Sequence, residues 1–175
     1  TRALSMAADA AISAAVNWLF RDGVRRGVFA RADASGFIVL GMGKLGAWEL
    51  NYSSDVDLLL LYDPEIIPIK NPDNIQQEMT RLSRGLSQLL EERTSDGYVH
   101  RTDLRLRPDP ASTPPAISIE TATVYYESIG QNWERAAMIK ARPIAGDVDV
   151  GWSFISSLRP FVWRRTLDFN AIRDI

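Results

Sequence analysis

The sequence predicts an α+β fold in which a mixed β-sheet is flanked by helices and followed by the start of a helical region. Two short apolar runs, residues 36–42 and 55–62, have the length and composition of buried strands. The connection between them is too short for the crossover that parallel neighbours need, which favours antiparallel or mixed pairing. Segments with apolar residues at three- and four-residue spacing surround these runs and predict helices.

The first half of the chain supplies two helices and the two apolar strands. The alanine-rich residues 6–22 predict a helix that ends loosely at Gly23 and Gly27. Residues 45–50 contain helix formers for about two turns between the strands. A longer helix is predicted over residues 75–93, with Asp73 or Asn74 as its cap.

The second half alternates between polar and apolar residues before it becomes helical. Residues 98–108 alternate strictly, which predicts a half-exposed strand. Ser118 is expected to cap a helix over residues 119–130, and residues 133–143 predict another. The segment from Gly151 onward is helical in pattern and rich in aromatic residues.

The composition is that of an ordinary globular chain and excludes several classes of site. The chain has 175 residues, 46% of them hydrophobic, with 20 Lys plus Arg against 22 Asp plus Glu and a formal net charge of -2. No overall basic field argues for a nucleic-acid or anionic-membrane partner. With no cysteine and one histidine, disulfides, thiolate metal sites and His-rich sites are excluded. Apolar runs too short to span a bilayer, and the lack of a basic-then-apolar opening, lead us to expect a cytoplasmic protein without a membrane partner.

A glycine motif at residues 41–46, GMGKLG, opens two interpretations. It fits G-x-G-x-x-G between a strand and a helix, and Asp63 lies near the distance at which dinucleotide folds keep their ribose-binding acid. The short strand-to-strand connection argues against that nicotinamide enzyme. The glycines are equally compatible with a tight strand-to-helix turn alone.

Two carboxylates, Asp55 and Asp57, stand at the start of the second apolar run. Residues two apart in a strand face the same way, so both carboxylates converge while Val56 and Leu58 point to the core. Convergent carboxylates repel unless a cation lies between them, and oxygen-only ligands select Mg²⁺, with Mn²⁺ as the other candidate. The alternative is a solvated turn or a local side-chain hydrogen bond to the backbone.

The alternating segment adds a third carboxylate and three guanidiniums. Its period of two places Asp103 on one face together with Arg101, Arg105 and Arg107. If this strand lies beside Asp55 and Asp57, Asp103 becomes the third metal ligand and the arginines become phosphate donors. An exposed strand face with ordinary ion pairs is the alternative. Three carboxylates that bind two divalent ions are typical of active sites that catalyse nucleotidyl transfer.

Three residues before the aspartates complete the predicted phosphate site. Gly43 belongs to the turn, and Lys44 lies in the first turn of the short helix, where it either binds phosphate oxygens or is a surface lysine. Ser54 directly precedes Asp55 and can hydrogen-bond the turn or a phosphate.

The order of Gly43, Ser54, Asp55, Asp57 and Asp103 resembles the nucleotidyltransferase superfamily that includes DNA polymerase beta. More narrowly, four blocks in sequence are similar to the glutamine synthetase adenylyltransferase/adenylyl-removing enzyme family: GMGKLGAWELNYSSDVDLLLLYD, DGYVHRTDLRLRP, YYESIGQNWERAAMIKARPIAGD and PFVWRR. The resemblance implies an N-terminal helical segment over 1–35, a nucleotidyltransferase catalytic domain over 36–147, and the start of a C-terminal helical region over 148–175 of a longer polypeptide.

The resemblance also implies an activity, metal ligands and partners. Asp55, Asp57 and Asp103 would be the catalytic carboxylates that bind Mg²⁺, with Arg105 and Arg107 near phosphate. The expected reaction removes AMP from an adenylylated tyrosine of glutamine synthetase by phosphorolysis and releases ADP. The adenylylating half, which transfers AMP from ATP, is the alternative, and an NAD-binding oxidoreductase or a silent regulatory module is more remote. Further expected partners are ATP, ADP, phosphate and, through the full-length enzyme, the signalling protein PII.

The sequence departs from the family pattern at two places and contains a second cluster of charged and aromatic residues. Ala47 stands where the family often has glycine, and the loop after Pro108 is poorer in glycine than usual. A second mixed cluster is expected to place Trp133 in the core rather than against adenine, with Glu134 and Lys140 as structural ion-pair partners and only some of its cations at the site. The members of this cluster are Trp133, Glu134, Arg135, Lys140 and Arg142.

Overall fold

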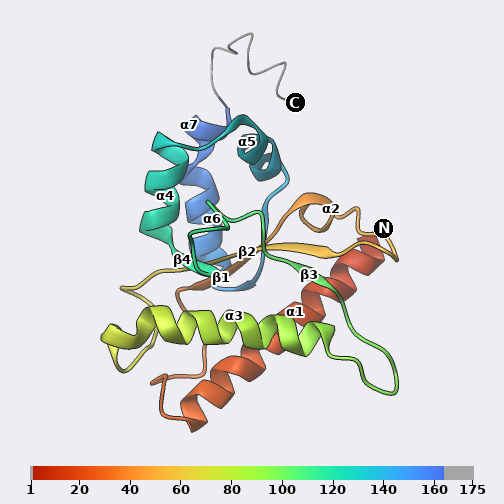
Figure 1. Ribbon diagram of the computed structural model, residues 1–175, viewed down its shortest axis with the longest axis vertical. Coiled ribbons are helices and arrows are strands. Elements are labelled where there is room, and N and C mark those ends of the chain that lie inside the picture. Colours follow the sequence, from red (N-terminus) through yellow and green to blue (C-terminus); the bar gives the residue numbers. More distant parts are fainter. Residues whose placement is uncertain (1, 164–175) are drawn as a thin grey trace.

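The computed structural model describes residues 2–163 and contains one mixed sheet with helices on both faces (Figure 1). Its elements, in chain order, are α1 (Arg2–Arg25), β1 (Phe37–Gly41), α2 (Gly43–Gly46), β2 (Val56–Tyr62), the 3₁₀ turn η1 (Pro72–Asn74), α3 (Ile75–Glu91), β3 (Thr102–Asp103), β4 (Ala116–Ser118), α4 (Ile119–Ser128), α5 (Asn132–Ile139), β5 (Arg142–Gly146), α6 (Val148–Ser157) and α7 (Arg159–Val162). The α+β class predicted from the sequence is confirmed.

The sheet has the strand order β3-β2-β1-β5, and β4 also pairs with β2. β1 runs antiparallel to both β2 and β5. β2 runs parallel to the short strands β3 and β4. The predicted antiparallel pairing of the two apolar strands is therefore confirmed, and no parallel β-α-β unit joins β1 to β2.

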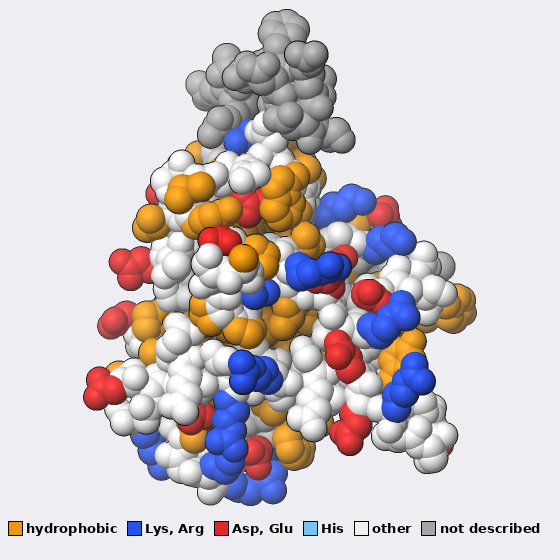
Figure 2. Space-filling view, in the orientation of Figure 1, with side chains coloured by type: hydrophobic (Ala, Val, Ile, Leu, Met, Phe, Trp, Pro, Cys, Tyr) orange, Lys and Arg blue, Asp and Glu red, His pale blue; other side chains and the backbone are white. Residues whose placement is uncertain are grey.

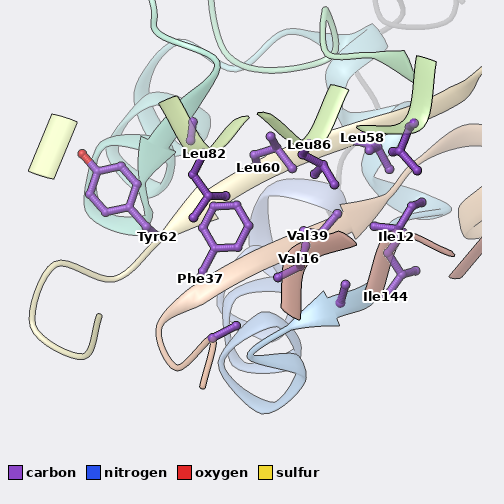
Figure 3. Packing of buried hydrophobic residues seen from close by; sticks show 14 of the residues in the cluster. Ile12, Val16, Phe37, Val39, Leu58, Leu60, Tyr62, Leu82, Leu86 and Ile144 are labelled. Carbon is purple, nitrogen blue, oxygen red and sulfur yellow. The ribbon is translucent and has the colours of Figure 1, made fainter. Parts of the chain in front are cut away.

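Both faces of the two central strands are buried, which separates the core into two layers. Phe37 and Val39 of β1 pack on the face covered by α1 and α3, as Figure 3 shows, whereas Ile38 and Leu40 pack on the other face. Helices α4, α6 and α7 cover that second face, with Tyr126 as one of its largest buried side chains. The alternation follows from the pleat of a strand, in which successive side chains point to opposite faces.

Helix α1 buries one face in the core. Its buried residues recur at three- and four-residue steps, and it lies against α3 and β5. Within residues 2–163 this is the one helix long and apolar enough to cross a membrane by length and composition. A core helix passes the same test, so the observation carries no membrane assignment.

The predicted strand over residues 98–108 is wrong except at Thr102 and Asp103. The carboxylate of Asp103 accepts the backbone N–H of Arg105 at 2.8 Å, a local turn that competes with further strand pairing. The chain then continues through turns and bends to β4, a three-residue strand that the proline-rich sequence did not indicate.

Other boundaries also shift from those predicted. The helix expected over residues 133–143 ends at Ile139, and Arg142 begins β5, an edge strand that tolerates Pro143. Helix α3 has no side-chain cap at Asn74; instead Asn71 caps the preceding 3₁₀ turn by accepting the N–H of Asp73. Helix α1 runs through Gly23 and ends at Arg25.

Other sequence predictions hold. Ser118 caps α4 through the N–H of Thr121, as predicted. Residues 148–157 and 159–162 of the predicted C-terminal helical region are helical, and its part beyond Trp163 lies outside the described residues.

The short helix α2 can pack closely because Gly46 has no side chain. A Cβ atom there would overlap the carbonyl oxygens of Lys140 and Gly41, both of them backbone atoms. We expect Gly46→Ala to lower the free energy of unfolding by roughly 3–5 kcal/mol, because the backbone must shift. Gly27→Ala is the control: Gly27 has a positive φ of 78° but open space around it, so a loss of about 1 kcal/mol is expected. Urea unfolding of both variants measures the difference, and equal losses would contradict the collision.

Candidate active site

The predicted acidic residues lie at the start of β2, beside β3 and α2. Asp57 pairs in register with Asp103 of the parallel strand β3, and Asp55 precedes Asp57 by two positions. Residues paired across parallel strands point to the same face, so the register places these two carboxylates side by side. Figure 2 shows acidic and basic side chains interspersed on the right-hand side, where Figure 1 places α2 and β3. The predicted neighbourhood of the second apolar strand and Asp103 is confirmed.

Two of the three carboxylates form ion pairs with arginines. Arg101 donates from Nε to Asp55 Oδ1 at 2.5 Å, and its Nη2 donates to the carbonyl oxygen of Ser53 at 3.1 Å. Arg105 contacts both oxygens of Asp103, with Nη2 at 2.5 Å from Oδ2. The hydrogen bonds from Arg105 hold the pKa of Asp103 below its usual range. The pairing of Arg101 with Asp55 was not predicted, although the alternating pattern had placed Arg101 on the acidic face.

Asp57 differs from its two neighbours because no arginine within residues 2–163 forms an ion pair with its carboxylate. Burial raises its pKa above the usual range, and the charges of Asp103 and Asp55 raise it further. The charges of Arg105 and Lys44 act in the opposite direction but are outweighed. Asp57 is therefore the carboxylate for which an added cation would relieve the most unfavourable charge.

Gly43 gives Asp57 the room that it needs. It has a φ of 50°, and a Cβ atom built on it would lie 2.8 Å from Asp57 Oδ2. Any larger residue would be strained and would press on the carboxylate. The predicted turn residue is thus in contact with the acidic cluster, although its role in phosphate binding stays a prediction.

Lys44 and Ser54 are joined to each other near the aspartates. Lys44 Nζ lies 3.2 Å from Ser54 Oγ, and Ser54 Oγ donates to Asn51 Oδ1 at 2.6 Å. This network connects α2 to the loop before β2. Binding of phosphate by Lys44 and Ser54 stays a prediction, and the sequence had not indicated Asn51.

Arg107 holds the loop that follows β3 rather than facing the carboxylates. Its guanidinium donates to the carbonyl oxygens of Leu104, Pro110 and Thr113, at distances from 2.7 to 3.3 Å. Burial lowers its pKa. The structure therefore shows a loop-stabilising role for Arg107, and its predicted phosphate contact stays a prediction.

The chemistry of the donors fits a hard divalent cation. Asp55, Asp57 and Asp103 offer only oxygen atoms, and two of them already attract guanidinium groups, which stand in for a cation. As the side chains stand, no group of three or more His, Cys, Asp or Glu among residues 2–163 is arranged to hold a metal ion. The carboxylates of Asp55 and Asp103 would have to exchange their arginine partners to become ligands.

The second predicted cluster proves to be mainly structural. Trp133 is 43% exposed, so its predicted core position is wrong. Glu134 is buried, completes the cap of α5 by accepting the N–H of Gln131, and accepts the hydroxyl of Tyr125. It is therefore not the ion-pair partner of Lys140.

The cations of this cluster bind elsewhere in the fold. Lys140 pairs with Glu49. Arg142 forms a largely buried ion pair with Asp9 of α1, donates to the carbonyl oxygens of Leu45 and Gly46, and lies 3.5 Å from the centre of the Trp48 ring. Arg142 thus ties α1 and α2 to β5.

Two cavities differ in their relation to the acidic residues. A cavity of about 690 Å³ lies between α1 and α3, and none of the predicted site residues lines it. A smaller cavity of about 210 Å³ is lined by Asn51, Ser53, Ser54 and Arg101, the residues next to Asp55. Because it lies next to the carboxylates, the smaller cavity is the candidate substrate pocket.

Comparisons with known proteins show which family the chain resembles. Residues 1–157 match the protein family described as glutamate-ammonia ligase adenylyltransferase. A bifunctional glutamine synthetase adenylyltransferase/adenylyl-removing enzyme of Rhizobium meliloti (strain 1021) is 57% identical over 178 positions, which cover 98% of this chain and 18% of the relative. The enzyme of the same description from Agrobacterium fabrum (strain C58 / ATCC 33970) is 52% identical, over 100% of the chain and 18% of the relative. The chain thus spans 18% of the length of these relatives.

The opposite pKa shifts of Asp57 and Asp103 predict opposite effects on stability. At neutral pH the ionised Asp57 is penalised by the fold, so Asp57→Asn should raise Tm by a few degrees at most. Asp103 is stabilised as an anion, so Asp103→Asn should lower Tm. As the pH falls, the difference for Asp57→Asn should shrink first, between the raised pKa of folded Asp57 and the ordinary value of 3.8. The difference for Asp103→Asn should shrink only below 3.8, as the pH falls through the lowered pKa of folded Asp103. Thermal unfolding between pH 3 and 7 tests this, and shifts of the same sign at pH 7 would contradict it.

Proposed function

Because the chain belongs to the glutamate-ammonia ligase adenylyltransferase family, we propose that it carries a nucleotidyltransferase site that removes AMP from an adenylylated tyrosine of glutamine synthetase. The observation that carries this proposal is the register of Asp57 with Asp103, beside Asp55. It brings together the three carboxylates expected of a nucleotidyltransferase from separate parts of the sequence. The names of the relatives supply glutamine synthetase and both directions of AMP transfer.

The proposed reaction is a phosphorolysis. An oxygen of inorganic phosphate attacks the phosphorus of the AMP group in line with the tyrosyl oxygen. The new phosphorus–oxygen bond forms ADP, while the bond to the tyrosine breaks and its phenolate takes up a proton. The reaction exchanges the ester bond between phosphorus and tyrosine for the phosphoanhydride bond of ADP, so positioning and charge stabilisation supply most of the catalysis.

The three aspartates would hold the divalent cation, and the arginines would bind phosphate. A bound magnesium ion supplies positive charge to the phosphoryl oxygens and to the leaving group. Asp55, Asp57 and Asp103 provide its oxygen ligands, and Gly43 keeps space beside Asp57. Arg105, exposed beside Asp103, has the fork of donors that suits phosphate oxygens.

The adenylylating half is the second candidate function. The same acidic site would then transfer AMP from ATP to the tyrosine. The similarity of WERAAMIKARP and PFVWRRTLDF to the adenylyl-removing half supports removal as the first choice. The antiparallel pairing of β1 and β2 argues against the NAD-binding alternative, since a dinucleotide fold needs parallel strands there. We propose a regulatory contact with PII only for the longer polypeptide that contains this chain.

Incubation with adenylylated glutamine synthetase, Mg²⁺ and phosphate should release ADP. Asp57→Asn should reduce the rate by a factor on the order of a hundred or more, because a ligand to the cation is lost. Circular dichroism checks that the variant is folded. Incorporation of AMP from ATP without ADP release in the forward assay would indicate the adenylylating half, and no turnover in either direction would favour a silent regulatory module.

Replacement of Arg105 should affect phosphate more than the protein substrate. We expect Arg105→Ala to raise the KM for inorganic phosphate about tenfold, because a charge-assisted donor is removed. The KM for adenylylated glutamine synthetase serves as the internal control. An unchanged phosphate dependence would count against a phosphate contact by Arg105.

A further inference from the structure

Two of the three carboxylates in the site are already occupied by positive charge. The guanidinium of Arg101 covers Asp55 Oδ1, and that of Arg105 spans both oxygens of Asp103. These are the oxygen atoms that a divalent cation would need. The two arginines flank β3 closely, one residue before it and two residues after it.

Asp57 lies beside these pairs without a comparable partner. In the described part of the chain, no hydrogen bond or ion pair joins its carboxylate to a lysine or arginine side chain. It still senses the charges of Asp55, Asp103, Arg105 and Lys44. The site therefore holds three carboxylates close together but supplies a directly bound guanidinium to only two of them.

The arginine side chains of these ion pairs are exposed, which allows a divalent cation to replace them at the carboxylates. The side chains of Arg101 and Arg105 are 58% and 83% exposed, respectively. The Asp55 side chain is 47% exposed and that of Asp103 is 17% exposed, so water and salt screen the Arg101–Asp55 pair on both sides and the Arg105–Asp103 pair mainly at its guanidinium. Among residues 2–163 the side-chain hydrogen bonds of Arg105 go to Asp103 alone. Release of Arg101 also breaks its exposed hydrogen bond to the carbonyl oxygen of Ser53. A divalent cation at clustered carboxylates can therefore replace the guanidiniums at the cost of these few surface hydrogen bonds.

We propose that Arg101 and Arg105 are placeholder cations, which neutralise Asp55 and Asp103 until a divalent cation takes these carboxylates and then turn to the phosphate oxygens of the substrate. This inference rests on the proposed function, since it assumes that the site uses a divalent cation. It assigns the two arginines a role in the order of binding. Phosphate is bound weakly while the guanidiniums are engaged, and metal binding releases them.

The proposal implies that metal and phosphate bind with positive coupling. By linkage, the factor by which the cation raises phosphate affinity equals the factor by which phosphate raises cation affinity. Direct contact between metal and phosphate would produce coupling too. The experiment must therefore distinguish release of the arginines by the metal from the attraction between the metal charge and phosphate. Variants that change the net charge equally, but differ in whether an arginine is released, make this distinction.

The first titration measures binding of Mn²⁺ alone to the purified chain by calorimetry or electron paramagnetic resonance. Arg101→Gln and Arg105→Gln remove a guanidinium that competes for a carboxylate, so the affinity for Mn²⁺ should rise about fivefold or more. Lys44→Gln is the matched control. It removes one positive charge near Asp57, but Lys44 donates to Ser54 and not to a carboxylate. Its effect on Mn²⁺ affinity should be clearly smaller.

The second titration measures binding of inorganic phosphate without any metal. Asp103→Asn releases Arg105 from its ion pair and keeps an oxygen that can accept the backbone N–H of Arg105. Phosphate should then bind about fivefold more tightly than to the unchanged chain. Asp57→Asn removes the same negative charge from the same cluster without releasing an arginine, so its gain in phosphate affinity should be clearly smaller than that of Asp103→Asn.

The outcomes separate this inference from the proposed function. If the unchanged chain binds Mn²⁺ but the arginine variants bind it no better than the Lys44 variant, the placeholder role is overturned and the metal site stands. Equal phosphate affinity in the two aspartate variants would overturn it as well. If the unchanged, folded chain does not bind Mn²⁺, the metal-dependent function fails and the inference fails with it.

Discussion

The central position of β2 is the constraint on which the site depends. β1 pairs along one edge of this strand, and β3 and β4 pair with the other, while its side chains enter both core layers. A slip by one residue would move every side chain to the opposite face and bring Asp57 towards the layer formed with α1 and α3. The apolar residues of β2 therefore fix the direction of Asp57, and the parallel pairing with β3 fixes its neighbour, Asp103.

This geometry forces like charges together, and the surrounding residues only partly compensate. The raised pKa of Asp57 reports the remaining cost, since burial and two neighbouring carboxylates outweigh the nearby cations. Gly43 does not offset the charge repulsion, but its lack of a side chain leaves space for Asp57 Oδ2 beside the turn. Such a local departure from the most stable arrangement is expected at functional sites, where charge chemistry takes precedence over stability.

The sequence predicted the parts of the fold that follow a regular period. The apolar runs predicted β1 and β2. The alternation of side chains placed Asp55 and Asp57 on one face, and Asp103 was expected beside them only if its segment paired with that strand, as β3 does with β2. The alternation could not show that the carboxylate of Asp103 turns the backbone and ends β3, because the same alternating residues suit a longer strand. β5 escaped detection because Arg142 and Pro143 do not look like strand residues, although an edge position accepts them. The glycine motif reflects close approach at Gly43 and Gly46, which a bare pattern cannot distinguish from pyrophosphate binding.

The exposure of the charged groups suits the proposed reaction, in which the AMP group is attached to another protein. Asp55 keeps 47% of its side-chain surface exposed, and its arginine partner and Arg105 are more exposed still. A deep pocket would bury such charges at a large desolvation cost and would exclude a phosphodiester attached to a folded protein surface. At the edge formed by β2 and β3 the same charges stay hydrated until a substrate arrives. The strand β2 that carries Asp57 is packed in both core layers, so we expect the aspartates to keep their places while the arginines change partners.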